Sequence, residues 1–231
     1  MMQFRIYSFA SSVDITESDE TLIMPEEEYF EEQTEENTVT AKKTKELKVV
    51  REEDIVNKRI FIGDSRTVAM CLEKTNLKYT EEKTVIGTDE IGDLWIAKSG
   101  EGLAWMKEHD GIENEIIEGT NIYIMMGVND CRFRNSWHLY KEYISEKEQE
   151  WEALGAKVIF ISVLPLSENA KSVTTNEDVK DFNDYIKTMT DIQYLDIYSL
   201  IEGDVQYTSD GIHYTEETYK DIYSLITTSK I

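Results

Sequence analysis

The chain has 231 residues, which is enough for one sizeable folded domain and an additional segment. Of these residues 40% are hydrophobic and 10% aromatic, enough to form a core. Its 47 acidic residues outnumber the 24 basic ones and give a formal net charge of -23. This balance argues against nucleic acid and anionic membrane surfaces as partners, because both are bound through Lys and Arg. No run approaches the roughly 20 apolar residues of a transmembrane helix.

The first part of the chain, residues 1–57, differs from the rest. It contains the acidic run PEEEYFEEQTEEN and shows no sustained periodicity. Clustered like charges with few apolar residues predict a disordered acidic arm or spacer. The opening residues contain no convincing signal peptide. The folded domain is therefore expected over residues 58–231.

From residue 59 onward, apolar runs alternate with segments of helical spacing. The predicted strands are residues 59–63, 94–99, 121–127, 157–165 and 192–198. The predicted helices are residues 65–74, 102–109, 135–155, 176–190 and 215–229. Several strands are apolar at consecutive positions, which is typical of parallel sheets buried on both faces. The alternation predicts a three-layer α/β/α sandwich with a mainly parallel five-stranded sheet.

The first predicted strand ends in GDSR, which places Ser65 at the start of a helix. Ligands of such sheets bind at the carboxyl ends of the strands, so this turn is a candidate site. A serine there has the free N–H groups and the positive dipole of the helix N-terminus beside it. The alternative is structural, because Asp64 and Ser65 are both common helix caps. A nucleophilic Ser65 also needs a base.

The candidate base is His213, in the segment DGIH near the end of the chain. Asp210 precedes it by three residues in a predicted loop, so its carboxylate can hold one ring nitrogen. The other ring nitrogen is then available to take a serine proton. Read alone, the same segment also fits an ordinary surface turn.

Two further strand ends carry candidate oxyanion donors. Asn129 follows the predicted strand that ends at Gly127, and an asparagine side chain can donate an N–H to an oxyanion. Gly100 or Gly102, in the segment SGEG, can offer a backbone N–H to the same space. Each signal by itself also fits a simple turn.

The cysteines and histidines point to no metal centre. Cys71 and Cys131 are too few for a disulfide framework and form no CxxC pair. The three histidines show no metal-ligand spacing, so no metal site is expected. The two cysteines are expected to be free thiols, and a bridge between them stays open.

Taken together and in this order, GDSR, SGEG, GVND and DGIH resemble the blocks of the SGNH/GDSL hydrolase family, the bacterial GDSL-like esterases and lipases. The resemblance implies the flavodoxin-like SGNH hydrolase fold, with Ser65 as nucleophile and His213 and Asp210 completing the triad. It implies that Ser65, Gly100 and Asn129 form the oxyanion hole, with Gly100 favoured over Gly102. It also implies that no metal or organic cofactor is needed.

The implied activity is that of a serine esterase that works through an acyl-enzyme, with O-acetyl groups on a carbohydrate as the preferred substrate. A lysophospholipase or thioesterase, and a non-catalytic surface carbohydrate-binding module on the same fold, stay open. Arg66, Trp105 and Tyr214 are candidate substrate contacts, with ordinary packing or ion pairs as the alternative. The expected partner is thus a small ester or an acetylated glycan.

The location and the oligomeric state are less constrained. Family habit and the spacer-like arm favour an extracellular or cell-surface protein. The absence of a convincing signal peptide keeps a cytoplasmic location open. The sequence gives no indication of the oligomeric state.

Overall fold

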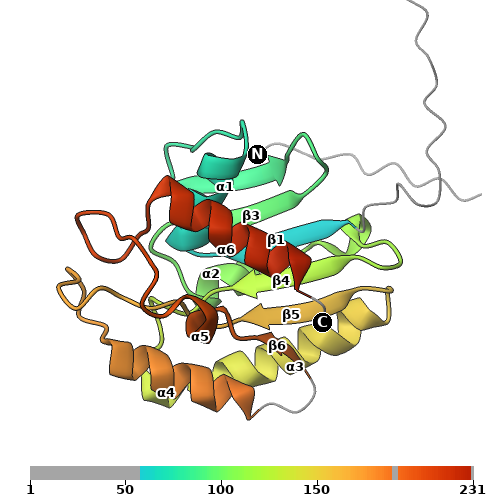
Figure 1. The fold of residues 1–231 in the computed structure, drawn as a ribbon. Helices are drawn as coiled ribbons and strands as arrows, with labels where there is room; N and C mark the ends of the chain where they lie inside the picture. The colour runs from blue at the N-terminus through green and yellow to red at the C-terminus, as the bar shows by residue number, and fades with distance from the viewer. Residues whose placement is uncertain (1–57, 189–191, 230–231) are drawn as a thin grey trace, which may run out of the picture. The chain divides into compact units, whose positions relative to one another are not determined.

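The computed structural model describes residues 58–188 and 192–229 (Figure 1). The expected acidic arm, residues 1–57, lies outside the described residues. The expected domain over residues 58–231 is described except for its two short gaps.

One six-stranded sheet runs through the described domain (Figure 1). Its strands are β1 (Arg59–Gly63), β2 (Thr84–Thr88), β3 (Leu94–Lys98), β4 (Asn121–Met125), β5 (Lys157–Ile161) and β6 (Gln193–Leu195). Their order in the sheet is β2-β3-β1-β4-β5-β6. All neighbours are parallel except β2 and β3, and the five parallel strands follow the flavodoxin-like order.

The expected five-stranded sheet is corrected to six strands by β2. This strand pairs antiparallel with β3 at the edge of the sheet. Only Thr84 and Val85 of β2 are buried, and Ile86 is exposed. An edge strand covered on so few positions lacks the continuous apolar run by which the other strands are recognised.

Alternate side chains of the central strands enter two separate core layers. Ile60 and Ile62 of β1 pack in one layer, whereas Phe61 packs in the other against Trp95 and Tyr123. This alternation follows from the two-residue period of a strand. The free thiols divide in the same way: Cys131 belongs to the first layer and Cys71 to the second.

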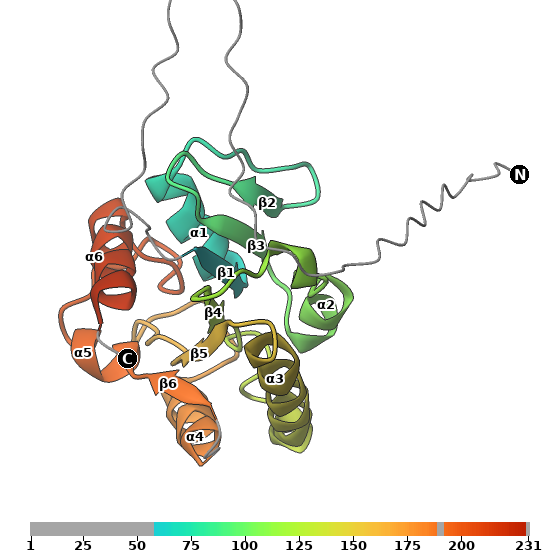
Figure 2. The ribbon, with the colours of Figure 1, turned by 90° about the vertical axis from the view of Figure 1, so that its right-hand side faces the viewer.

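Helices cover both faces of the sheet (Figure 2). They are α1 (Ser65–Lys74), α2 (Leu103–Glu108), α3 (Trp137–Glu152), α4 (Asn176–Lys187), α5 (Ile197–Ile201) and α6 (Glu216–Thr228), with short 3-10 turns at Glu113–Glu115 and Arg134–Ser136. Side chains of α1, α5 and α6 pack in the layer of Phe61, and those of α2, α3 and α4 in the layer of Ile60. None of the helices in the described residues is both long enough and apolar enough to span a bilayer.

The last predicted strand, residues 192–198, combines two elements in the structure. Only Gln193–Leu195 forms β6, and Asp196 then caps α5 by accepting a hydrogen bond from the Ser199 N–H. A short apolar run cannot be divided by periodicity alone, but an aspartate inside it is a helix-start signal.

Candidate active site

Ser65 lies where β1 gives way to α1, at the carboxyl edge of the sheet. Asp64 caps the helix, and its side chain accepts a hydrogen bond from the Arg66 N–H at 3.0 Å. Thr67 in the first turn donates to the Met125 carbonyl at the end of β4. Ser65 is therefore the first residue of a helix whose N-terminus is fixed to the centre of the sheet.

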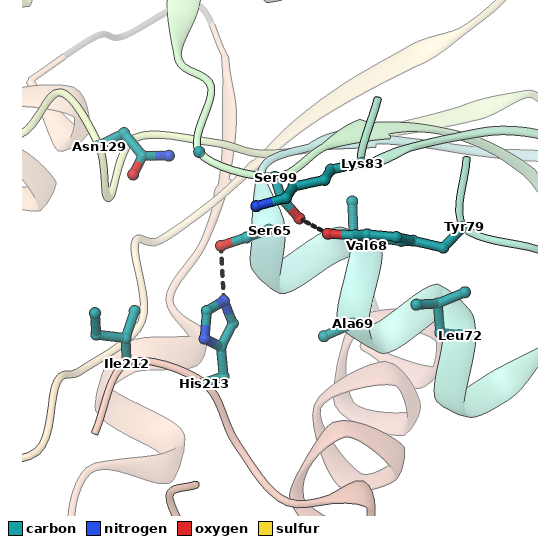
Figure 3. Close-up of a pocket in the computed structure, with 11 residues that line it drawn as sticks. Ser65, Val68, Ala69, Leu72, Tyr79, Lys83, Ser99, Asn129, Ile212 and His213 are labelled. Carbon is teal, nitrogen blue, oxygen red and sulfur yellow. Dashed lines mark hydrogen bonds between the residues drawn. The ribbon is translucent and has the colours of Figure 1, made fainter. Parts of the chain in front are cut away.

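His213 lies against this serine from a loop 148 residues further along the chain. Its Nε2 is 2.8 Å from Ser65 Oγ, and its Nδ1 is 2.7 Å from Asp210 Oδ2 (Figure 3 shows the serine contact). These are hydrogen-bond distances that a nucleophile, a general base and an orienting carboxylate require. The structure thus brings Ser65, His213 and Asp210, all expected from the sequence, into one chain of contacts.

The Asp210 carboxylate is held in its charged form. Burial raises the pKa of Asp210, but hydrogen bonds from the His213 backbone and ring, the Ile212 N–H and the Thr208 hydroxyl outweigh it. The net effect keeps the pKa of Asp210 well below its usual range. A carboxylate that stays charged can hold the His213 Nδ1 proton and the orientation of the ring.

Asp64 has the opposite electrostatic environment. It is 2% exposed, and burial raises the pKa of its carboxyl, although the Arg66 charge and backbone N–H groups of Arg66 and Val128 oppose the change. Its oxygens face the start of α1, so Asp64 acts as the helix cap and Asp210 as the carboxylate partner of His213.

Gly100 and Asn129 line the same pocket as Ser65 and His213. The Asn129 amide donates one hydrogen bond to the Glu101 carbonyl at 2.6 Å, which ties its loop to the loop of Gly100. Gly100 has a φ of +80°, and the space where a Cβ would stand is open. In the described part of the chain no hydrogen-bond partner is found for the Gly100 N–H.

Gly102, the other candidate, has a packing role. A Cβ at this position would lie 2.0 Å from Asp130 Oδ2. That oxygen accepts hydrogen bonds from the Leu103 N–H at 2.8 Å and the Tyr140 hydroxyl at 2.6 Å. Gly102 thus lets the start of α2 approach Asp130, and Gly100 is the glycine that faces the pocket.

The Ser65 pocket has a volume of about 650 Å³ and is lined by Ser65, Val68, Ala69, Leu72, Tyr79, Lys83, Ser99, Gly100, Asn129, Ile212 and His213 (Figure 3). One wall comes from α1. Another comes from the segment between α1 and β2, where the Tyr79 hydroxyl lies 2.6 Å from Ser99 Oγ. The pocket therefore extends from the nucleophile along α1.

Arg66, expected as a candidate substrate contact, instead joins segments of the protein interior. Arg66 is 2% exposed, and its guanidinium donates to the carbonyls of Leu164, Pro165 and Ile212. All three acceptors are backbone groups, so the side chain is turned away from the pocket. Because Ile212 precedes His213, Arg66 connects the helix of the nucleophile to the loop of the base.

Trp105 and Tyr214 also lie outside the pocket lining. Trp105 is 5% exposed and stacks on His109, with ring centroids 4.4 Å apart. Tyr214 is 2% exposed, and its hydroxyl donates to the Pro165 carbonyl. Both side chains pack in the interior, which is the alternative that the sequence analysis left open to substrate contact.

Sequence reasoning missed most of the residues that shape the pocket. Val68, Ala69 and Leu72 follow Ser65 by three, four and seven positions, which is one face of a helix. The helix was predicted, so this stripe could have been found from it. Tyr79 and Lys83 could not, because they precede the unpredicted strand β2.

Part of the described domain matches a known protein family. The family described as GDSL-like Lipase/Acylhydrolase matches residues 112–226. The matched region contains Asn129, Asp210 and His213, whereas Ser65 and Gly100 precede it. The comparison with curated proteins gives no match.

Several solved structures share the fold at low sequence identity. A lipase/acylhydrolase from Enterococcus faecalis has 16% identity and a TM-score of 0.52, over 74% of this chain and 93% of its own. A GDSL-like lipase from Bacteroides thetaiotaomicron has 20% identity and a TM-score of 0.53, over 74% and 85%. An acetylxylan esterase from Geobacillus stearothermophilus has 15% identity and a TM-score of 0.50, over 76% and 95%. At these identities the likeness concerns the fold.

Proposed function

We propose that this chain, which belongs to the family of GDSL-like lipases and acylhydrolases, hydrolyses carboxylic esters through an acyl-enzyme formed on Ser65. The observation that carries the proposal is the contact of His213 with Ser65 on one side and Asp210 on the other. That arrangement supplies a nucleophile, a base and a group that orients the base.

In the first step, Ser65 Oγ forms a bond to the ester carbonyl carbon while its proton moves to His213 Nε2. The carbonyl oxygen becomes an oxyanion, for which the Ser65 and Gly100 N–H groups and the Asn129 amide are the proposed donors. Collapse of this intermediate breaks the bond to the alcohol, which leaves with the proton from His213. Water then attacks the acyl-enzyme by the same route, releases the acid and restores Ser65.

Within this activity, O-acetyl groups on a carbohydrate are our first proposed substrate. Tyr79 supports it, because this half-exposed ring lies in the Ser65 pocket and can pack on a sugar face. Longer acyl chains, as in a lysophospholipase or thioesterase, are the second candidate. The apolar stripe of Val68, Ala69 and Leu72 favours them, since it leads away from Ser65.

The direct test compares 4-nitrophenyl acetate hydrolysis by the full chain and by Ser65→Ala. Loss of the nucleophile should lower kcat by at least about 1,000-fold. Ser224→Ala, which removes an exposed hydroxyl on α6, should leave the rate unchanged. Activity that persists in folded Ser65→Ala would refute the nucleophile. A folded wild type without activity would favour a non-catalytic binding module.

The acyl length is a separate measurement. A series of 4-nitrophenyl esters from acetate to octanoate, with acetate release from an acetylated glycan, distinguishes the two substrate candidates. A steep fall in kcat/KM beyond acetate supports the O-acetyl proposal, and a rise toward octanoate supports the longer acyl chain.

A further inference from the structure

Lys83 is the charged side chain of the Ser65 pocket to which the proposed mechanism gives no role. Figure 3 shows it extending from the segment between α1 and β2 toward Ser65, with its ammonium group at the inner end. None of the eleven lining residues is acidic, although the chain has 47 acidic residues. Lys83 is therefore the basic side chain of this pocket beside the proposed base His213.

Within the described residues, no carboxylate lies within ion-pair distance of the Lys83 ammonium. Across residues 58–188 and 192–229, six lysines form ion pairs with carboxylates, and Lys83 is not among them. Its chain neighbours Glu81 and Glu82 are exposed and do not line the pocket. A cation that faces the nucleophile without a partner is free to bind an anionic group of a substrate.

The backbone of Lys83 gives a second, independent reason to look for a function. Its φ of +59° is left-handed, and Lys83 is the non-glycine residue with positive φ in the described part of the chain. The conformation is fixed by hydrogen bonds from the Lys83 N–H to Thr80 and from the Ser99 N–H to the Lys83 carbonyl. Residues held in such unfavourable conformations cluster at functional sites.

We propose that Lys83 is a specificity-determining residue that selects esters carrying a carboxylate or phosphate close to the ester bond. This inference rests on the proposed esterase activity of Ser65. The anionic group can belong to the acyl part or to the alcohol part of the ester, and its recognition is the same in both cases. The acidic surface repels anions at long range, but salt screens that repulsion beyond about 10 Å at 0.1 M.

The test uses two pairs of esters that differ only in one carboxylate. The 4-methylumbelliferyl esters of pentanoic and glutaric acid place it on the acyl part, and phenyl and 4-carboxyphenyl butyrate place it on the leaving group. Rates with Ser65→Ala are subtracted to remove spontaneous hydrolysis. Lys83→Met should lower kcat/KM for the anionic member of at least one pair by about 5- to 10-fold. The neutral member should keep its rate.

Three variants separate recognition from structure. Lys83→Arg keeps the charge and should restore most of the preference, whereas Lys78→Met, which neutralises an exposed lysine outside the pocket, should not change it. Lys83→Gly removes the charge and also relieves the left-handed backbone, so it should lose the preference while its Tm rises. The wild-type preference should shrink in 1 M salt.

An equal loss on neutral and anionic esters, or no change in either pair, would overturn the inference and leave the esterase proposal standing. Absence of turnover with all four esters would instead refute the esterase proposal. Calorimetry of glutarate binding to Ser65→Ala, with and without Lys83→Met, needs no turnover. Equal affinities there would overturn the role of Lys83 independently.

Discussion

Asp210 shows most clearly how single residues of the site divide their tasks. Oδ1 accepts from two backbone N–H groups and the Thr208 hydroxyl, so that Oδ2 remains directed at His213 Nδ1. An asparagine at this position would present an amide N–H to a nitrogen that must itself donate. We therefore expect Asp210→Asn to lower kcat by about 1,000- to 10,000-fold through the wrong histidine tautomer, measured by steady-state kinetics.

The same substitution has a consequence for stability. Because the folded-state pKa of Asp210 is lowered, its interactions stabilise the fold above the ordinary pKa of about 3.9 and are lost as the pH falls toward the folded-state value. Urea unfolding should therefore show Asp210→Asn less stable than wild type at pH 6. The difference should shrink at pH 3. A difference that grew on acidification would contradict the charged carboxylate.

Arg66 shows where residue-level prediction stops. Ser65, His213 and Asp210 could be predicted because their types and order at strand ends carry the chemistry. The sequence does not show that the guanidinium turns inward to three carbonyls from two distant loops. Whether a polar side chain faces a pocket depends on packing, and the structure buries Arg66 and Tyr214 outside the lining of the Ser65 pocket.

At the scale of elements, the oxyanion side of the site depends on how two loops meet. Asn129 Nδ2 reaches the Glu101 carbonyl, and Asp130 Oδ2 reaches the Leu103 N–H, so two adjacent hydrogen bonds join the loop after β4 to the start of α2. The approach is close enough that Gly102 cannot carry a side chain without moving Asp130.

We accordingly expect Gly102→Ala to displace Asp130, lower the free energy of unfolding by about 2 kcal/mol and reduce kcat with little effect on KM. Chemical denaturation and steady-state kinetics measure the two effects. Gly111→Ala is the matched control, because a Cβ at Gly111 meets no atom within 4 Å. If both variants behaved alike, the close contact at Gly102 would not govern the site.

The elements also separate into those that could be predicted from the sequence and those that could not. The helix after β1 spans residues 65–74 as expected, because an apolar periodic run follows a capping aspartate. β2 was missed because it is a short edge strand in which only Thr84 and Val85 are buried. That miss hid Tyr79 and Lys83, which the hairpin of β2 and β3 brings to the pocket.

At the scale of the whole domain, the sheet separates two hydrophobic layers, each containing one cysteine. Burial raises the pKa of Cys71 to about 11 and that of Cys131 to about 12. Both thiols are 0% exposed. We expect neither to react with iodoacetamide at pH 8 in the folded protein and both to react in urea, as counted by intact-mass measurement. Fast labelling of the folded protein would contradict the packing of these layers.

The central claim is that β1, α1 and the loop of His213 together make Ser65 a nucleophile. Reaction of the full chain with a fluorophosphonate, followed by peptide mass spectrometry, tests it most directly, because such probes phosphonylate activated serines. We expect one adduct, on Ser65, that forms at least about 100-fold more slowly in His213→Gln. Ser99→Ala, which removes the other serine hydroxyl of the pocket, should leave the adduct in place. A folded protein that stays unlabelled, or an adduct on Ser99, would contradict the account.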